Sequence, residues 1–466
     1  MSFKITIIGA GSVGFTQKLV SDILCVPEFH DVEIALTDIS ADNLGMIEQI
    51  ISTIVKSNNL AAKVTATTDR REALKDARYI MSCVRVGGLP AFATDIDIPL
   101  KYGVDQCVGD TLCIGGIMYG QRNIPVILDF CRDICEVAEP DALFLNYANP
   151  MAMNTWAALA YGGVRTIGLC HGVQHGAEQI AEVLGVPEVD YICAGINHQT
   201  WFTDIKIGHR KVSREELIAG FEAHPVFSRQ EKLRIDVLKR FGFYSTESNG
   251  HLSEYLAWYR KGDFSDWIDY SDWIHGETGG YLRVTQERRN WFETDFPAFL
   301  KEAETPLGAY VRTNEHASYI LEAIETGRTY RGHFNTRNDG VISNLPDDAI
   351  IEAPGYVDRF GINMVEGLEL PMACAATCIS SINVQRMAVE AAMTGDVELL
   401  KLAVLHDPLT GAICTPDEIW AMVDEMLVAQ AEWLPQYAHA LPEAKKRLAA
   451  SRVQTKDWRG AARRAV

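Results

Sequence analysis

The sequence lacks the features of a membrane-spanning or secreted protein. None of its apolar runs approaches the ~18 residues that a transmembrane helix requires, so we expect no membrane partner. The N-terminus has no basic start followed by a long apolar core, because Lys4 leads directly into the short run Ile5–Ile8. The 11 cysteines are scattered, which excludes a dense disulfide scaffold. We therefore expect no signal peptide, reduced thiols and a cytoplasmic location.

Basic residues are also scarce. The chain has 43 Lys and Arg against 62 Asp and Glu, a formal net charge of −19. Because a field of this sign repels polyanions, nucleic acid is excluded as a partner, and a small-molecule substrate is favoured. We find no internal repeat and no low-complexity segment. The 47% apolar and 23% charged composition is that of a globular protein, and the length of 466 residues predicts two or three domains.

Short apolar runs alternate with helix-period segments over the first 200 residues. Alternation of this kind predicts a mostly parallel sheet covered by helices on both faces, a Rossmann-like doubly wound α/β fold. We expect this domain to span residues 1–196, and a second α+β domain to span residues 197–466. Within the latter, the apolar spacing predicts helices over 311–327 and 381–404. The strand-like runs of the first domain are Lys4–Ile8, Glu33–Thr37, Lys63–Thr67, Tyr79–Val84, Ala142–Asn146, Val164–Leu169 and Tyr191–Ile196.

A glycine-rich turn follows the first predicted strand. Gly9, Gly11 and Gly14 fit the pattern G-x-G-x-x-G and open a predicted helix. In that context the glycines allow a tight turn, approach of a pyrophosphate and close helix packing, and the free N–H groups at the helix start, beside Ser12, bind phosphate. Asp38 ends the second strand and suits a ribose 2′-hydroxyl, whereas it would repel a 2′-phosphate. The sequence therefore predicts NAD rather than NADP, the alternative being a structural turn without a ligand.

Three polar segments follow later strands. They carry Asn149, Cys170 and His198, and the carboxyl ends of parallel strands share one edge of a sheet, where ligands bind. Thiolate and imidazole could hold one divalent metal and leave positions open for substrate hydroxyls. The alternatives are a core cysteine and a hydrogen-bonded histidine. A nucleophilic Cys170 with His171 as its base is disfavoured, because adjacent side chains on an extended segment point in opposite directions.

Several motifs together resemble glycoside hydrolase family 4, the NAD- and divalent-metal-dependent glycosidases. Within that family the chain is most similar to the melibiase-type bacterial α-galactosidases. The resemblance covers most of the chain and rests on Gly9–Thr16, Asp38, Val86–Gly88, Asp110–Leu112, Asn146–Asn154, Cys170–Gln174, Ala194–His198, Thr246–Ser248, Arg337–Gly340, Asn344–Pro346 and Ile382–Gln385.

This resemblance implies a reaction in which NAD oxidises carbon 3 of the sugar, the glycosidic bond breaks by elimination, water adds and the hydride returns. It implies that Cys170 and His198 bind Mn²⁺ or another divalent transition metal, and that Asn149 contacts a substrate hydroxyl. It also suggests Tyr255 as the base, His171 as a general acid and, near the sugar, Asp110. A homodimer or homotetramer is expected for this family.

Two differences from the melibiase-type motifs leave the identity of the sugar undecided. Gly172 follows Cys170–His171 where the melibiase-type members carry Ser, and Ser248–His251 differs from their Ser-Ser-Glu-His. The same chemistry on α-glucosides, α-glucuronides or α-galacturonides is therefore an alternative to α-galactosides, whereas His171 argues against a sugar phosphate. An oxidoreductase like malate or lactate dehydrogenase is an alternative of another class. Those enzymes need no metal, so Cys170 with His198 suits them poorly.

Overall fold

The computed structural model describes residues 2–261, 267–268, 275–287 and 294–455. Within these residues the strands are β1 (Lys4–Ile8), β2 (Glu33–Thr37), β3 (Lys63–Thr67), β4 (Tyr79–Ser82), β5 (Leu143–Asn146), β6 (Arg165–Gly168), β7 (Asp190–Ile196), β8 (Gln199–Ile207), β9 (Arg210–Lys211), β10 (Tyr244–Ser245), β11 (Tyr330–Arg337), β12 (Ile350–Asp358) and β13 (Gly361–Met364). They form one sheet in the order β10-β8-β7-β12-β11-β6-β5-β4-β1-β2-β3, with β13 paired to β12 and β9 to β8.

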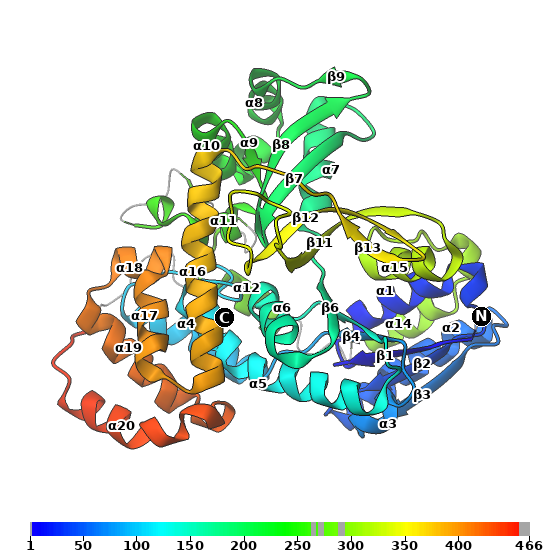
Figure 1. Cartoon of the computed structure of the whole chain (residues 1–466), viewed down its shortest axis with the longest axis horizontal. Coiled ribbons are helices and arrows are strands. Elements are labelled where there is room, and N and C mark those ends of the chain that lie inside the picture. The colour runs from blue at the N-terminus through cyan, green and yellow to red at the C-terminus, as the bar shows by residue number, and fades with distance from the viewer. Residues whose placement is uncertain (1, 262–266, 269–274, 288–293, 456–466) are drawn as a thin grey trace.

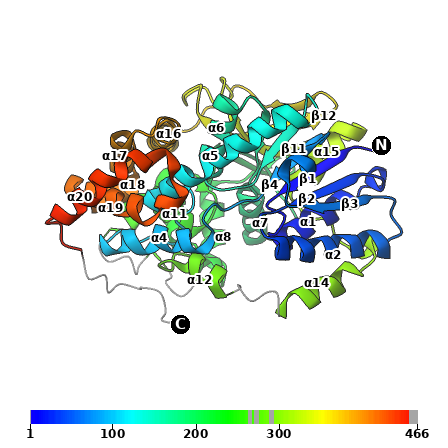
Figure 2. The same ribbon diagram turned by 90° about the horizontal axis from the view of Figure 1, so that it is seen from below.

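The helices cover this sheet and fill the end opposite the N-terminal strands, where α16 to α20 gather (Figures 1 and 2). None of the described helices is long and apolar enough to cross a membrane. Their bounds are α1 (Val13–Leu24), α2 (Ala41–Ser57), α3 (Arg70–Leu74), α4 (Gly88–Lys101), α5 (Cys113–Val137), α6 (Met151–Ala157), α7 (Gly172–Leu184), α8 (Arg214–Ala223), α9 (Phe227–Gln230), α10 (Lys232–Phe241), α11 (Asn249–Tyr255), α12 (Gly280–Glu287), α14 (Phe296–Ala303), α15 (His316–Thr326), α16 (Met372–Thr394), α17 (Val397–His406), α18 (Pro408–Ile413), α19 (Pro416–Ala429) and α20 (Leu441–Ala450).

The predicted Rossmann-like half is confirmed. Strands β3-β2-β1-β4-β5-β6 are all parallel. Their side chains alternate between two cores, because successive residues of a strand face opposite sides of the sheet. Ile7 packs with Leu19 of α1 and Ile47 of α2, whereas Ile80 packs with Ile127 of α5. Full burial of one such side chain contributes roughly 1.5–3 kcal/mol, which holds helices on both faces.

The parallel arrangement does not extend to the last predicted strand of this half. β7 is antiparallel to both β8 and β12. Two strands from much later in the chain, β11 and β12, lie between β6 and β7, which local periodicity could not reveal. One sheet therefore continues across the predicted domain boundary at residue 196, and the boundary itself stays a prediction.

The helix predicted over 381–404 is two helices. α16 ends at Thr394, because Gly395 has a φ of 71°, a left-handed conformation that stops a helix. Asp396 then caps α17, since its side chain accepts hydrogen bonds from the backbone N–H groups of Glu398 and Leu399. The helix predicted over 311–327 is α15.

Candidate active site

The glycine turn lies at the carboxyl end of β1, where the strand order reverses. β2 and β3 lie on one side of β1, and β4, β5 and β6 lie on the other, the place where open α/β sheets bind ligands. Gly9 has a φ of 80°, and a Cβ there would lie 2.8 Å from the carbonyl oxygen of Cys83. A Cβ at Gly14 would lie 3.5 Å from the ring of Phe299, an ordinary van der Waals distance, so packing alone does not require glycine there. Ser12 is exposed at the start of α1, and its side chain makes no capping hydrogen bond.

Asp38 supports this turn from the end of β2. Its Oδ2 accepts a hydrogen bond from the N–H of Gly11 at 2.8 Å, and its Oδ1 accepts one from the N–H of Ser40 at 2.8 Å. A Cβ at Gly11 would lie 2.7 Å from Asp38 Oδ2, which requires glycine here. Each carboxylate oxygen keeps a further lone pair for a ligand hydroxyl. The structure therefore brings Gly9, Gly11, Ser12 and Asp38 to one edge of the sheet.

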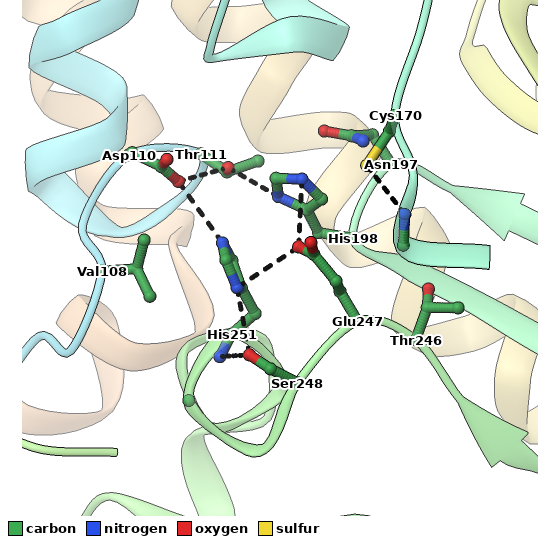
Figure 3. Close-up of polar contacts among 12 residues, drawn as sticks. Val108, Asp110, Thr111, Cys170, Asn197, His198, Thr246, Glu247, Ser248 and His251 are labelled. Carbon is green, nitrogen blue, oxygen red and sulfur yellow. Dashed lines mark hydrogen bonds and ion pairs between the residues drawn. The ribbon is translucent and has the colours of Figure 1, made fainter. Parts of the chain in front are cut away.

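Three potential metal ligands meet beside this edge (Figure 3). Cys170 precedes α7, Glu247 follows β10, and His198 lies in the two-residue turn between β7 and β8 with a φ of 62°. One ligand atom of each lies within 4.8 Å of the other two. A non-glycine residue in the left-handed region is uncommon and often marks a functional position. The sequence prediction that Cys170 and His198 lie close together is thus met, and Glu247 joins them.

Hydrogen bonding fixes the protonated nitrogen of His198. The Thr111 hydroxyl donates to Asp110 Oδ1 at 2.8 Å, so it must accept from His198 Nδ1 at 2.9 Å. Burial lowers the pKa of His198 to about 4, which leaves the ring neutral at pH 7 and Nε2 without a proton. That nitrogen lies 3.3 Å from Glu247 Oε2, so two acceptors face each other. A cation bound between them would relieve this repulsion.

The charges of the trio fit a divalent metal. Burial alone would raise the pKa of Glu247, but His198, His251 and His171, which are all protonated at low pH, lower it to about 2. Burial raises the pKa of the Cys170 thiol well above its usual value, and the charge of Glu247 adds to this. A bound metal reverses that effect, because a coordinated thiol is deprotonated. Thiolate, imidazole and carboxylate together suit Mn²⁺ or a similar transition metal.

A second polar group adjoins the trio. Asn149 Nδ2 donates to Asp110 Oδ2 at 2.8 Å. His251 lies between two carboxylates, with Nε2 3.5 Å from Asp110 Oδ1 and Nδ1 3.4 Å from Glu247 Oε2. Burial would lower the pKa of His251, but these carboxylates raise it to about 9. Burial would raise the pKa of Asp110, yet its bond to His251 holds it far below the usual range. Asn149 and Asp110 therefore lie together, as expected of sugar contacts.

His171 is oriented by a carboxylate from a distant part of the chain. Its Nδ1 lies 3.3 Å from Glu315 Oε1, and its Nε2 lies 3.9 Å from Glu247 Oε1. Burial would lower the pKa of His171, but its bond to Glu315 and the charge of Glu247 raise it to about 9. A protonated imidazole that is 39% exposed can donate a proton to an entering ligand, which suits the predicted general acid.

Tyr255, the predicted base, is the last residue of α11 and lies next to the turn that carries His198. Its hydroxyl donates to the main-chain oxygen of Asn197 at 3.1 Å, next to His198, and the side chain is buried. Burial raises the pKa of Tyr255 well above its usual value, and the charges of Asp110 and Glu254 add to this. A base that acts at neutral pH needs the opposite shift. Without a bound cation Tyr255 is therefore protonated at neutral pH, and its role as the base stays a prediction.

Three site residues were not singled out from the sequence. Glu247 and His251 lie in segments already compared with the family, but their ligand geometry depends on β10 pairing with β8. Glu315 had no signal at all, because it reaches His171 across 144 residues through the packing of α15 on the sheet. Glu352, on β12, is also buried nearby, and burial with the charge of Glu247 raises its pKa to about 8.

A doubly wound sheet with a glycine turn at its switch point and candidate metal ligands beside it is typical of a nucleotide-dependent enzyme with a metal-assisted site. Residues 4–186 match the model of the family 4 glycosyl hydrolases, and residues 193–410 match the model of their C-terminal domain. The chain belongs to this family. Its sequence resemblance is thereby confirmed, and the dehydrogenase alternative is not supported.

Relatives match the chain over its whole length. An α-galactosidase of Rhizobium meliloti (strain 1021) is 73% identical, with 100% of this chain and 96% of that protein covered. An α-galactosidase of Bacillus subtilis (strain 168) is 33% identical, with 93% and 99% covered. A 6-phospho-α-glucosidase from gut microorganisms, solved with NAD and Mn²⁺, has the same fold, with a TM-score of 0.77, 20% identity, and 93% of this chain and 99% of that chain covered.

Proposed function

We propose that this protein hydrolyses small, non-phosphorylated α-galactosides with the help of NAD and a divalent metal such as Mn²⁺. The observation that carries the proposal is the unprotonated pair His198 Nε2 and Glu247 Oε2, which faces Cys170 beside a nucleotide-type glycine turn. The turn is linked to the site through Cys83, on which Gly9 packs, because the charge of Glu315, the partner of His171, acts on that thiol. We propose galactose as the sugar because the relative with 73% identity is an α-galactosidase.

The glycine turn is the proposed NAD site. The N–H groups at the start of α1 and the Ser12 hydroxyl, which makes no capping hydrogen bond, would bind the pyrophosphate near Gly9, Gly11 and Gly14. Asp38 would accept from a ribose hydroxyl, and its negative charge would repel the 2′-phosphate of NADP. Its bonds to Gly11 and Ser40 already fix the direction of the carboxylate, so little order is lost when the nucleotide binds.

Cys170, His198 and Glu247 would hold the metal and leave positions for two sugar hydroxyls. When bound, NAD would supply hydride transfer to and from the sugar, and the metal would supply Lewis acidity toward the sugar's hydroxyl oxygens. Asn149, fixed by Asp110, would orient the ring through a hydroxyl. His171, protonated and oriented by Glu315, would give its proton to the departing glycosidic oxygen.

Removal of the carbon 2 proton needs a base close to the ring. The sequence suggests Tyr255, but its hydroxyl already donates to Asn197. Asp110 is ionised, and it lies beside Asn149 and the trio. Because its bond to His251 holds its pKa far below the usual range, Asp110 is a weak base, and Tyr255, whose pKa a bound metal would lower, stays the proposed base.

Other sugars remain alternatives to galactose, and specific observations support them. Gly172 and the segment Ser248–His251 depart from the melibiase-type pattern, which keeps α-glucosides and α-uronides open. More distant relatives include an α-glucosidase of Erwinia rhapontici at 25% identity and an α-galacturonidase of Bacillus subtilis at 26%. We also propose a cytoplasmic homodimer or homotetramer, from the reduced cysteines and the family resemblance.

One assay separates these alternatives. The purified protein is incubated with NAD, Mn²⁺ and thiol, and with the 4-nitrophenyl derivatives of α-galactose, α-glucose, α-glucuronic acid and α-galacturonic acid. We expect nitrophenol from the galactoside without net NADH. Cys170→Ser, which replaces a soft thiolate by a hydroxyl, should lose metal affinity and activity together. Net NADH would indicate a dehydrogenase, and full activity in chelator would exclude the metal.

A further inference from the structure

Two groups act on the Cys170 sulfur against the effect of its buried surroundings. Burial raises the pKa of the thiol well above its usual value, and the charges of Glu247 and Glu352 add to this. The Gly172 N–H, which donates to Cys170 Sγ at 3.4 Å, and the side chain of Asn197 act in the opposite direction. The Asn197 amide is therefore a second potential donor to the sulfur.

The side chain of Asn197 is fully buried and unpaired. Its exposed fraction is 0%, and neither Nδ2 nor Oδ1 makes a hydrogen bond within the described residues. The main chain at this residue is fixed, because its carbonyl oxygen accepts from the Tyr255 hydroxyl at 3.1 Å. The amide lies beside the Cys170 sulfur (Figure 3). Since an unpaired buried amide costs stability, one in this place points to a partner that forms when the site is loaded.

Strand register brings a buried carboxyl group to the same amide. Glu352 of β12 pairs with Gly195 of β7 on one side and with Asn335 of β11 on the other. Asn197 lies two residues beyond Gly195. Glu352 is 1% exposed, and its Oε1 makes no hydrogen bond in the part of the chain that the structure describes. Burial raises the pKa of Glu352 to about 8, and the side chains of Asn197 and Asn335 act against this rise. The Asn197 amide therefore faces both this carboxyl group and the Cys170 sulfur.

We propose that Asn197 is a positioning residue of the metal site: one N–H of its amide donates to the Cys170 sulfur when that sulfur is a metal-bound thiolate, and the other donates to Glu352. The inference rests on the metal site of the proposed function. A thiol is a weak acceptor, which leaves the amide unpaired in the metal-free protein, whereas a thiolate is a charged acceptor and forms a stronger hydrogen bond. Hydrogen bonds of this kind orient a metal ligand, and their loss typically weakens metal binding about 10- to 100-fold.

The test uses Co²⁺, because cobalt bound by a thiolate absorbs near-ultraviolet light through transfer of charge from sulfur to the metal. Asn197→Leu removes both N–H groups and keeps the branching of the side chain. We expect it to weaken Co²⁺ binding about tenfold in a titration of the metal-free protein. The absorption should move to longer wavelength, since the lost hydrogen bond had lowered the energy of the sulfur electrons. NAD affinity should stay unchanged, which shows that the protein is folded.

Two comparisons separate this role from a general effect on packing. Asn335→Leu removes another buried amide that acts on Glu352 from the neighbouring strand, and it should leave the sulfur absorption in place. Glu352→Gln keeps an oxygen that accepts from Asn197 and should also leave it in place, whereas Glu352→Leu should move it to longer wavelength. An absorption that does not move in Glu352→Leu would remove Glu352 from the proposal.

The outcomes distinguish this inference from the proposed function. Unchanged Co²⁺ affinity and absorption in Asn197→Leu would overturn the role of Asn197. Weaker binding with an unmoved absorption would also overturn it, because the amide would then be a structural group. If Asn197→Leu does not bind NAD, the smaller change Asn197→Ala decides by the same two measurements. A wild type that binds Co²⁺ without the sulfur absorption, or does not bind it, would instead remove Cys170 from the metal site, and this inference would fall with it.

Discussion

Glu247→Gln is the sharpest test of the metal site, because it removes one charge and keeps the shape. Glu247 Oε2 lies 3.3 Å from the unprotonated Nε2 of His198 and 3.4 Å from Nδ1 of His251. A unit charge ~4 Å from another contributes ~4 kcal/mol at an effective dielectric of 20, and a dication doubles this. The glutamine variant avoids the desolvation cost of the charge, and its amide oxygen can still coordinate the metal. These two effects offset most of that Coulomb energy. We expect ~2 kcal/mol, or roughly 30-fold weaker Mn²⁺ binding.

The assay is calorimetric titration of Mn²⁺ into the metal-free protein, with NAD affinity measured in parallel. NAD binding should stay within about twofold, since Glu247 does not contact the glycine turn. Glu182→Gln makes the same change at an exposed position, where Glu182 Oε1 pairs with His224 at 3.1 Å, and should leave Mn²⁺ affinity unchanged. Unchanged Mn²⁺ affinity in Glu247→Gln would refute the assignment of the third ligand.

Three further predictions follow from the same geometry. Asp38→Ala should weaken NAD about tenfold and NADP less, by fluorescence titration, and better activity with NADP in the unaltered protein would contradict the assignment. In heavy water the sugar product should gain deuterium at carbon 2 by NMR, and Tyr255→Phe should abolish this exchange. Exchange that survives in Tyr255→Phe would move the base elsewhere, with Asp110→Asn the next variant to test. Burial and the charge of Glu247 disfavour ionised Glu352, whose pKa rises from 4.5 to about 8 in the folded protein. The folded state therefore keeps its full stability below pH 4.5, where Glu352 is protonated, and loses it as the pH rises through 8. The Tm of the metal-free protein should therefore fall from pH 5 to 8.5, and less so in Glu352→Gln.

The nucleotide half could be predicted because its signals are local. Each βα unit repeats the change from a two-residue to a 3.6-residue period, and the glycine turn lies between the first strand and helix. The second half has no such repeat. β11 and β12 enter the sheet from residues 330–358, and their place between β6 and β7 depends on pairings across more than 130 residues.

The meeting of Cys170 and His198 was predicted correctly on a premise that holds only in part. The prediction assumed parallel strands with a common carboxyl edge, but β7 is antiparallel to β12. A single row of pairings, Gly168 to Asn335, Asn335 to Glu352, and Glu352 to Gly195, joins the ends of β6 and β7. Cys170 and His198 lie two and three residues beyond that row, so they meet through strands that the sequence pattern did not place.

Gly172 illustrates how a specificity signal in the sequence can have a different physical basis. Because the melibiase-type members carry Ser at this position, the glycine bears on the choice of sugar. In the structure a Cβ at Gly172 would lie 2.9 Å from Glu247 Cγ and 3.2 Å from its Cβ, too close for the present packing. A serine here would displace Glu247, and with it the oxygen that faces His198 Nε2. The residue after His171 therefore acts first on the position of a proposed metal ligand, and any effect on the choice of sugar would follow from that displacement of Glu247.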